Sequence, residues 1–383
     1  MRLIHTADLH LDACYARAGF DAAFGRERRA GLRAVLTRIL QRAAEWPADA
    51  VLIAGDLFDL ERISRDTIGY LQNAFADISP VTVLIAPGNR DPFTSTSPYA
   101  AETWPENVRI FSRPEWQQFD VPGANLTVHG FAFDGADISR NPFGALAIPQ
   151  DGRVHVAVAH GSEMSHTPRG KAPLAPFAAS AAAKPGLAYL ALGHYHETRA
   201  IDAPHGTAMH YCGAPEGHGF EETGPRHYLE VQVERDVARV ERKIASDVVY
   251  AAHTLDCSPF ESAQEVVEAI LDKTGGQANR TILRIALIGT ASPAWQGDME
   301  SIRAQVARRT LALDLQDNTE LLEDYNALGR EQTSLGSFIK RMNDELNDAP
   351  DEDRRSLVRR ARQVGLAAYR GRDLPAAGLP RED

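Results

Sequence analysis

Seven residues with metal-binding side chains follow apolar runs of the sequence, at points where strands are predicted to end. They comprise two carboxylates, one amide and four imidazoles: Asp8, His10, Asp56, Asn89, His160, His194 and His196. A single histidine after a strand is more often a hydrogen-bonded structural residue, and a Gly-Asp pair is more often a turn. Seven such residues in one domain are hard to explain in that way. Mixed His, Asp and Asn ligands suit divalent ions such as Mn²⁺, Fe²⁺ or Zn²⁺.

The set is large enough for two ions. A pair of divalent ions needs a bridging carboxylate, and together the ions can hold a phosphate and activate water. Asp56 is the natural bridge. We expect one ion to be completed by Asp8, His10 and His196, and the other by Asn89, His160 and His194. His194 and His196 are two residues apart, so in extended backbone both imidazoles point to the same side.

The segments before these residues alternate between strand and helix patterns. Strands are predicted at RLIHT, DAVLIAGD and VTVLIAPGN, with one helix carrying Leu32, Leu36 and Ile39 and another over residues 65–78. This order implies right-handed crossovers and a mostly parallel sheet, in which ligands bind beyond the carboxyl ends of the strands. After about residue 108, strands joined by Pro/Gly-rich loops are predicted.

The character of the sequence changes near residue 246. We expect three parts: a main domain over 1–245, a small α+β domain over 246–315, and a helical segment over 316–383 with a disordered tail. A helix is expected to begin at Ser258, with Pro259 at its first position and Glu261 at its third. The apolar stripe of the last part, Leu335, Phe338, Ile339 and Met342, is more often internal core than a partner groove.

The bulk composition excludes several classes of protein. The 383 residues carry a formal net charge of −11, which argues against a broad basic face that coats nucleic acid. The three cysteines form no CxxC pair, so neither a disulfide framework nor a zinc knuckle is supported. No apolar run is long enough to span a bilayer. Asp8 and His10 interrupt any signal-peptide core, so we expect a cytoplasmic protein.

Five short segments, in this order, resemble the signatures of the calcineurin-like metallophosphoesterase superfamily: DLHLD, GDLFD, GNRD, AHG and GHYH. TADLHLD, LIAGDLFD and YCGAPEGHGFEETGPRHY further resemble the SbcD-type DNA repair exonucleases. The motifs cover roughly residues 1–245, and the rest is similar only by position and character. The resemblance implies an α/β (αββα) metallophosphoesterase sandwich with a small α+β capping domain and a helical C-terminal segment. It also implies DNA as substrate, Mn²⁺ as the favoured ion, a homodimer and an SbcC-like coiled-coil ATPase as partner.

Position 90 departs from the family pattern. The residue after the turn asparagine is usually a histidine that contacts phosphate and is thought to protonate the leaving oxygen, with Asp91 nearby to orient it. The catalytic candidates are therefore Arg90 and Asp91. The pKa of arginine is above about 12, so Arg90 cannot serve as a proton donor. It could instead bind two phosphate oxygens, or it could point away and pair with a carboxylate such as Asp91.

We expect a metal-dependent nuclease that acts on DNA ends, an exonuclease with possible endonuclease activity. The sequence leaves two alternatives open: a phosphodiesterase or phosphatase for a small nucleotide or phosphoprotein, and a DNA-binding scaffold weakened in catalysis by Arg90. The loop SHTPRGK supplies three further candidate contacts to a nucleic-acid backbone, His166, Arg169 and Lys171.

Overall fold

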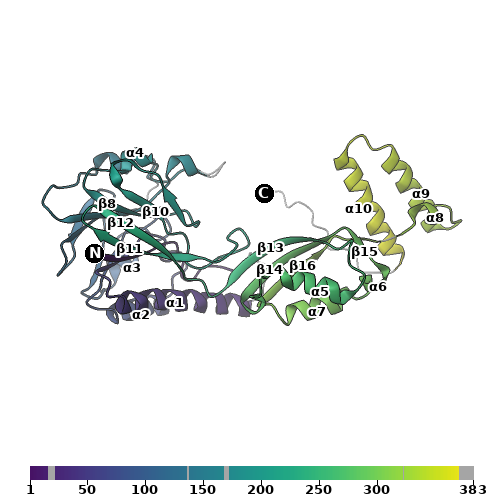
Figure 1. Ribbon diagram of the computed structural model, residues 1–383, viewed down its shortest axis with the longest axis horizontal. Helices are drawn as coiled ribbons and strands as arrows, with labels where there is room; N and C mark the ends of the chain where they lie inside the picture. Colours follow the sequence, from purple (N-terminus) through teal and green to yellow (C-terminus); the bar gives the residue numbers. More distant parts are fainter. Residues whose placement is uncertain (16–21, 136–137, 168–171, 322, 371–383) are drawn as a thin grey trace. The chain divides into compact units, whose positions relative to one another are not determined.

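The computed structural model of the protein describes residues 1–15, 22–135, 138–167, 172–321 and 323–370. The chain forms two compact units, Met1–Val249 and Tyr250–Asp383 (Figure 1). The three-part division at residues 245 and 315 stays a prediction. The tail predicted to be disordered, residues 371–383, lies outside the described residues.

The first unit contains two six-stranded sheets. The strand order of the first sheet is β12-β11-β1-β2-β3-β4. Its strands are β1 (Arg2–Thr6), β2 (Ala50–Ile53), β3 (Thr82–Ile85), β4 (Val108–Ile110), β11 (His227–Glu234) and β12 (Val237–Ile244). Strands β1 to β4 are parallel, as the alternation of strands and helices predicted, and β11 joins β1 antiparallel.

The order of the second sheet is β5-β6-β7-β8-β10-β9. Its strands are β5 (Gln117–Asp120), β6 (Leu126–Gly130), β7 (Val154–His160), β8 (Leu187–Gly193), β9 (Arg199–Ile201) and β10 (Ala208–Tyr211). The four central strands are parallel, and β5 and β9 flank them antiparallel. These two edge strands were not predicted, because QQFD and RAI are short and lack an apolar run.

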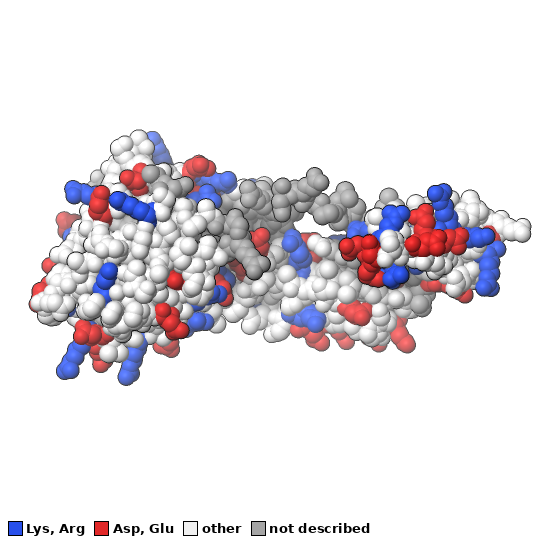
Figure 2. Space-filling model, turned by 90° about the horizontal axis from the view of Figure 1, so that it is seen from above, with Lys and Arg blue, Asp and Glu red and all other residues white. Residues whose placement is uncertain are grey.

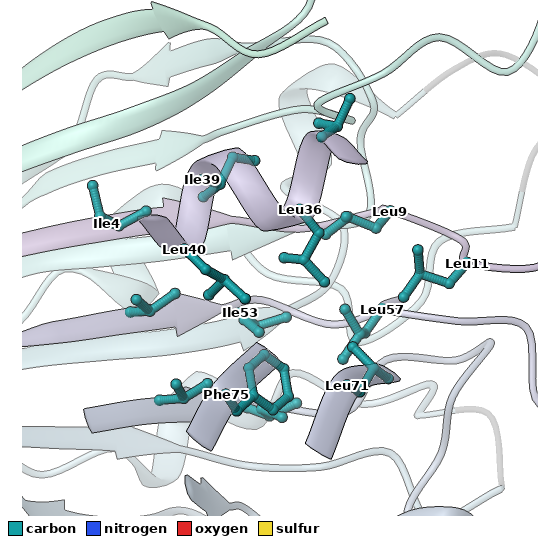
Figure 3. Packing of buried hydrophobic residues seen from close by; sticks show 14 of the residues in the cluster. Ile4, Leu9, Leu11, Leu36, Ile39, Leu40, Ile53, Leu57, Leu71 and Phe75 are labelled. Atoms are coloured by element: carbon teal, nitrogen blue, oxygen red, sulfur yellow. The ribbon is translucent and has the colours of Figure 1, made fainter. Parts of the chain in front are cut away.

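Apolar residues on both faces of the strands build the layers. Along β2, Ala50 and Leu52 face the second sheet, whereas Val51 and Ile53 face helices, as alternation along a strand requires. Those helices are α1 (Ala22–Glu45) and α2 (Arg65–Ala76), whose leucines and Phe75 cover the first sheet (Figure 3). Phenylalanines and the short helices η2 (Pro142–Ala145) and α4 (Ala179–Ala182) cover the second sheet. The predicted αββα sandwich is confirmed.

The two sheets approach each other closely where β2 and β8 end. A Cβ atom at Gly193 would clash with the carbonyl oxygen of Ala54, and one at Gly88 would clash with the carboxylate of Asp56. Glycine at these positions therefore lets strand ends of both sheets reach one small volume.

The second unit is built on the three-stranded sheet β13-β14-β16. These strands are β13 (Val249–Asp256), β14 (Thr281–Ile288) and β16 (Ala312–Asp317), and the helices α5 (Ala263–Asp272) and α7 (Met299–Ala307) pack on one face. The expected helix start at Ser258 is wrong. Ser258 Oγ bonds Asp256 and Thr290 instead, and Ser262 caps α5 in a capping box with Glu265.

The remaining helices of this unit form a packed group: α8 (Tyr325–Leu328), α9 (Ser334–Asn347) and α10 (Glu352–Tyr369). Ile339 of the apolar stripe is fully buried and Phe338 contacts the Tyr369 ring, whereas Leu335 and Met342 are partly buried, so the stripe contributes in part to the internal packing of this group. The shortest elements of the chain are α3 (Pro98–Ala101), η3 (Met164–His166), η4 (Pro204–Gly206), η5 (Ala278–Arg280), β15 (Thr290–Ala291), α6 (Pro293–Gln296) and β17 (Glu320–Leu321). No described helix combines the length and apolar composition needed to cross a membrane.

Replacing Gly193 by alanine should push the two sheets apart, since the added methyl group meets backbone rather than a flexible side chain. We expect Gly193→Ala to lower the free energy of unfolding by about 2 kcal/mol or more, measured by urea denaturation. Gly69→Ala in α2 is the matched control, because nothing lies within 4 Å of its added Cβ. The control should be neutral or stabilising by up to about 1 kcal/mol. Equal free energies of unfolding for the two variants would contradict the close approach of the two sheets at Gly193.

Candidate metal centre

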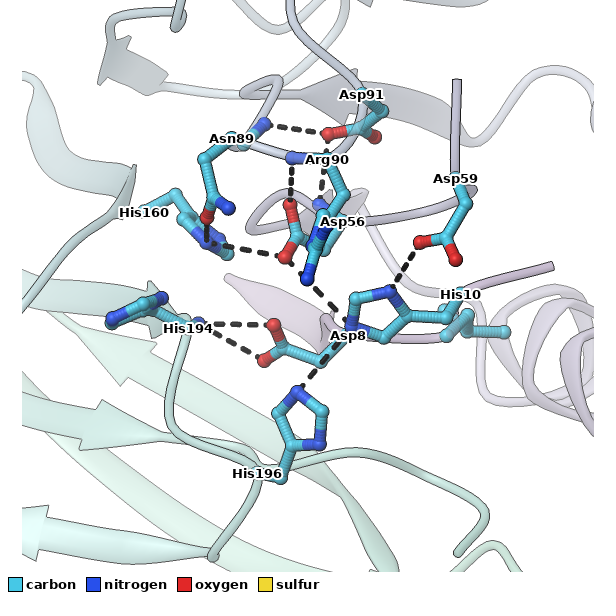
Figure 4. A network of polar contacts seen from close by, with 12 residues as sticks. Asp8, His10, Asp56, Asp59, Asn89, Arg90, Asp91, His160, His194 and His196 are labelled. Carbon is cyan, nitrogen blue, oxygen red and sulfur yellow. Dashed lines mark hydrogen bonds and ion pairs between the residues drawn. The ribbon is translucent and has the colours of Figure 1, made fainter. Parts of the chain in front are cut away.

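The structure brings all seven predicted ligand residues to one place, at strand ends of both sheets (Figure 4). Asp8 and His10 follow β1, Asp56 follows β2, Asn89 follows β3, His160 ends β7, and His194 and His196 follow β8. Donor atoms of Asp8, His10 and His196 lie within 4.8 Å of one another, as do those of Asp8, Asp56 and His160. Metal binding by these residues stays a prediction, and their geometry is described below.

His10 and His196 form one half of the site. Their Nε2 atoms are 3.3 Å apart. The Nδ1 atom of His10 lies 2.8 Å from the Asp59 carboxylate, and that of His196 lies 2.6 Å from the Glu222 carboxylate. Because an ionised carboxylate only accepts hydrogen bonds, each Nδ1 donates, and in the neutral rings each Nε2 is an acceptor that faces the other. A cation between such nitrogens, either a proton or a metal ion, removes their repulsion.

His160 and Asn89 form the other half. His160 Nδ1 donates to the carbonyl oxygen of Ala54 at 2.9 Å, which leaves Nε2 as an acceptor. Asn89 turns its oxygen, not its NH₂ group, towards this nitrogen at 3.0 Å. The His194 ring lies 5.1 Å from the His160 ring, centroid to centroid. Two acceptor atoms again face each other, as ligands of one ion would.

Asp56 lies between the two halves. Its Oδ2 atom is 3.5 Å from His160 Nε2 and 3.7 Å from His10 Nε2. Its Oδ1 atom accepts a hydrogen bond from the backbone N–H of Arg90 at 2.9 Å. One carboxylate oxygen is thus held by the chain while the other is shared by both halves, which is the position a bridging ligand needs.

The pKa shifts of the site residues also indicate an excess of negative charge. Burial, and then the charge of Asp56, raise the pKa of Asp8 well above its usual range. Burial lowers the pKa of His10, but the Asp59 hydrogen bond and the charges of Asp56 and Asp8 outweigh it and raise the pKa to about 9. Both residues thus hold protons more tightly than usual, because protons offset a negative charge that a metal ion would otherwise offset. The residues fit a pair of divalent ions. When bound, such ions act as Lewis acids on a phosphate and lower the pKa of water.

Four of the seven residues have an unusual backbone. The φ angles of Asp8, His10, Asp56 and His194 are 53°, 47°, 51° and 104°. Few non-glycine residues adopt this left-handed region, and each costs about 1–3 kcal/mol unless its surroundings enforce it. Such strain gathers at functional sites. Here it occurs where a strand ends and the chain turns its side chain into the site.

Asp91 is fully buried and bonds the backbone. Its carboxylate accepts the N–H groups of Asp56, Leu57 and Gly88 at 2.7–2.9 Å and the Tyr99 hydroxyl at 2.7 Å. The sequence grouped Asp91 with Arg90 as catalytic and as the residue that orients position 90. Its hydrogen bonds join the turn at Asn89 to the loop at Asp56, so Asp91 holds the turn that carries Arg90, and its catalytic role stays a prediction.

Arg90 is exposed and extends from its turn towards the middle of the group (Figure 4). Burial raises the pKa of Asp59, but the hydrogen bond and charge of His10, and then the charges of Arg90 and Arg62, lower it below its usual value. Arg62 is also exposed. No carboxylate in the described ranges forms an ion pair with either guanidinium. Arg62 is hydrogen-bonded to Cys14, and both cations lie at the rim of the site.

Sequence reasoning missed Glu222, which holds His196 and also bonds the backbone N–H of His218 at 3.1 Å. Glu222 lies in the quoted segment YCGAPEGHGFEETGPRHY, but no periodicity points to it. Asp59 holds His10, while Asp12 bonds Ser64 and Thr67 at the start of α2.

In the loop after β7, His166 is hydrogen-bonded to Glu163 at 2.8 Å. The two other candidate backbone contacts of that loop, Arg169 and Lys171, lie outside the described residues.

The chain is similar to several known proteins. Residues 1–198 match the family of calcineurin-like phosphoesterases. The chain is similar to the uncharacterized metallophosphoesterase YhaO of Bacillus subtilis, at 28% identity over 305 residues, 77% of this chain and 73% of that protein. It is also similar to a component of the nuclease SbcCD of Staphylococcus epidermidis, at 25% identity over 142 residues, 36% of this chain and 35% of that one.

Two solved structures align over 64% of this chain, each with 10% identity and a TM-score of 0.37. They are a Thermus thermophilus protein, covered to 98%, and a dimetal phosphatase from Danio rerio, covered to 96%.

Metal binding should stabilise the first unit, because ions bind the folded arrangement and not the unfolded chain. Mn²⁺ at about 100 times its dissociation constant should add about 2.7 kcal/mol, seen as a rise in melting temperature that a chelator reverses. Asp56→Asn should lose most of this rise, since it weakens the shared ligand. An equal rise in both proteins would contradict a metal site centred on Asp56.

Proposed function

The chain belongs to the calcineurin-like phosphoesterase family and is a metal-dependent phosphoester hydrolase, and from that premise we propose that it is a two-metal DNA nuclease. It cleaves phosphodiester bonds from DNA ends, with endonuclease activity as well. The observation that carries the proposal is the shared position of Asp56 between two sets of facing acceptor atoms, with the exposed guanidiniums of Arg90 and Arg62 near Asp59 at the rim.

The roles of the residues follow from their contacts. Asp59 and Glu222 hold the imidazoles of His10 and His196, and Asp91 holds the turn that carries Arg90. Arg90 binds non-bridging phosphate oxygens and offsets the charge that grows on them during P–O cleavage. It supplies no proton, so the leaving oxygen takes its proton from water. Losing a general acid costs typically about 10²–10⁴-fold in rate, which slows the reaction without abolishing it.

A polynucleotide fits the rim better than a single phosphate does. Arg62 and Arg90 both act on Asp59, so two cations flank the site and can contact successive phosphates of one strand. Elsewhere, Lys and Arg are interspersed with Asp and Glu on the face shown in Figure 2. DNA affinity would therefore come from this short contact and from a partner. The similarity of part of the chain to a component of a nuclease points the same way.

The remaining features of the proposal come from the resemblance. Mn²⁺ is the proposed ion, with Fe²⁺, Zn²⁺ or Mg²⁺ as substitutes that the same donor types accept. The protein is proposed to act in the cytoplasm as a homodimer with an SbcC-like coiled-coil ATPase, which would bring most of the DNA-binding surface.

One observation favours a second function. Arg90 in place of a proton donor fits a scaffold protein that binds DNA and has little activity of its own. A phosphodiesterase for small nucleotides is the other alternative. Comparing bis-p-nitrophenyl phosphate with p-nitrophenyl phosphate separates diesterase from monoesterase chemistry, and a strong monoester preference would count against a nuclease.

The first test is Mn²⁺-dependent degradation of linear and circular DNA by the purified chain. We expect linear DNA to disappear faster than circular DNA, and Asp56→Asn to lower the rate at least about 100-fold, because the two ions then lack their shared ligand. If the wild type binds two ions but degrades no DNA, the protein is either a scaffold or a nuclease that needs a partner. Addition of the ATPase separates these two.

Arg90→Ala should lower kcat/KM on DNA by about 10- to 1,000-fold, as expected for a lost donor to the transition state. Arg90→His should recover or exceed the wild-type rate, since histidine can donate a proton. Arg239→Ala on the exposed edge strand β12 is the matched control and should change nothing. If Arg90→Ala leaves both kcat and KM unchanged, the side chain does not touch the substrate.

A further inference from the structure

Strand β12 forms a long open edge of the first sheet. It has eight residues and, in the described part of the chain, pairs only with β11. The other edge strands of the two large sheets, β4, β5 and β9, have only three, four and three residues. Short edge strands protect a protein, because the unpaired N–H and C=O groups of a long one can bind another strand. β12 lacks this protection, and Val237 and Ile244 at its two ends are each 64% exposed.

The pairing with β11 decides which residues of β12 direct their backbone groups outward. Ala245, just after β12, donates its N–H to the carbonyl oxygen of Arg226 at 2.8 Å, and the two strands keep one continuous register. Hydrogen-bonded and non-hydrogen-bonded pairs alternate along antiparallel strands, so the odd-numbered residues of β12 bond to β11. The residues whose N–H and C=O groups point to the open edge are therefore Ala238, Val240, Arg242 and Ile244.

A second copy of β12 fits this edge in one register. A closed dimer of identical chains has a two-fold axis, so two β12 strands meet antiparallel. With Val240 on the axis, outward backbone groups of both copies meet in about six hydrogen bonds. Arg239 then lies opposite Glu241 of the second copy, and the reverse pair forms as well. A shift to either side would place Arg239 or Glu241 opposite its own counterpart, and like charges directly opposite are destabilising.

The side chains of β12 are free to make these contacts. Arg239 is exposed, and no carboxylate in the described ranges forms an ion pair with it. The side chain of Glu241 is 65% exposed and contacts Lys243 of its own strand at 2.8 Å. On the other face of the strand, Val240 packs against the apolar core between the two sheets. Its counterpart in a second copy would extend that apolar layer.

We propose that the protein forms a two-fold homodimer through β12, in which the first sheets of two copies join into one sheet centred on Val240. The inference rests on the homodimer of the proposed function, to which it assigns a surface and a register. Because β12 contributes no residue to the metal centre, each copy keeps its own site. DNA cleavage per copy should therefore be the same in every β12 variant.

The first experiment measures the mass of the full chain by sedimentation equilibrium, without DNA or metal, between about 1 and 100 µM. The wild type should dimerise. Arg239→Glu should raise the dissociation constant at least about tenfold, because two attractive pairs become two repulsive ones. Adding Glu241→Arg to this variant exchanges both charges and should restore the wild-type constant. Arg242→Glu is the matched control: it makes the same change of charge on the same strand but lies opposite Ala238 of the second copy, so the constant should change by no more than about threefold.

Cysteine cross-linking tests the register. It uses a Cys14→Ser background, because Cys14 is exposed and the two other cysteines are buried. Directly opposite residues have Cα atoms about 4.5–5.5 Å apart, within the range of a disulfide. Val240→Cys should therefore cross-link with itself. Arg239→Cys and Glu241→Cys should cross-link with each other in a mixture but not with themselves, because positions two residues out of register are about 8 Å apart.

Each outcome separates this inference from the proposed function. A monomer at the highest concentration would overturn the inference and the homodimer but not the nuclease. A dimer that Arg239→Glu leaves unchanged would keep the homodimer and refute β12 as its surface, and a different cross-linking pattern would refute the register. If Arg239→Glu fails to fold, the cross-links decide. Monomers that bind through β12 only when the ATPase is added would show that another protein covers this edge, against the inference. A dimer of the expected register without DNA cleavage would refute the nuclease and keep the inference.

Discussion

The site in the first unit requires hydrogen-bond acceptor atoms to be held facing each other. Nε2 of His10 faces Nε2 of His196 at 3.3 Å, and Nε2 of His160 faces the oxygen of Asn89 at 3.0 Å. Such pairs repel until a cation stands between them, so the protein must supply rigidity that the ligands themselves lack. Each imidazole is fixed from behind, by Asp59, Glu222 or the carbonyl of Ala54. Each imidazole is thus held by a partner within the chain itself, which limits the ordering that binding of an ion would require.

The surrounding structure absorbs the strain of this arrangement. Asp8, His10, Asp56 and His194 take left-handed backbone conformations that their own side chains disfavour. The buried carboxylate of Asp91 bonds three backbone N–H groups and so holds the loops after β2 and β3 together. Glycine at position 193 removes a side chain that would keep the sheets apart, and glycine at position 88 removes one that would clash with Asp56. Large apolar clusters on both faces of the first sheet offset these local costs, because their burial favours the same packing.

Much of this could be predicted from the sequence, and the limits have physical reasons. Asp8, Asp56 and His160 follow strong apolar runs, so the strand ends and the parallel strands of the first sheet were accessible from periodicity, whereas the αββα layers were implied by the family resemblance. The family signatures are short and ordered, which located the seven site residues. Glu222 gave no such signal, because it lies in a loop without regular structure and acts through another residue. The left-handed backbone of Asp8 is a tertiary effect that propensity does not encode. Ser258 has a sequence pattern typical of a helix cap, but Ser262 caps α5 instead. The hydroxyl of Ser258 is hydrogen-bonded to Asp256 and Thr290.

The order of the site residues along the chain affects when the site forms during synthesis and folding. Asp8 and His10 leave the ribosome first, but the imidazole that faces His10 belongs to His196, and its carboxylate support to Glu222. Contacts between positions so far apart in sequence form late, after much of the loop-closure entropy has been lost. A nascent or truncated chain thus holds isolated ligands and no centre. Hydrolytic capacity arises only once both sheets are complete and have docked, so an unfinished chain is harmless to the phosphoesters around it.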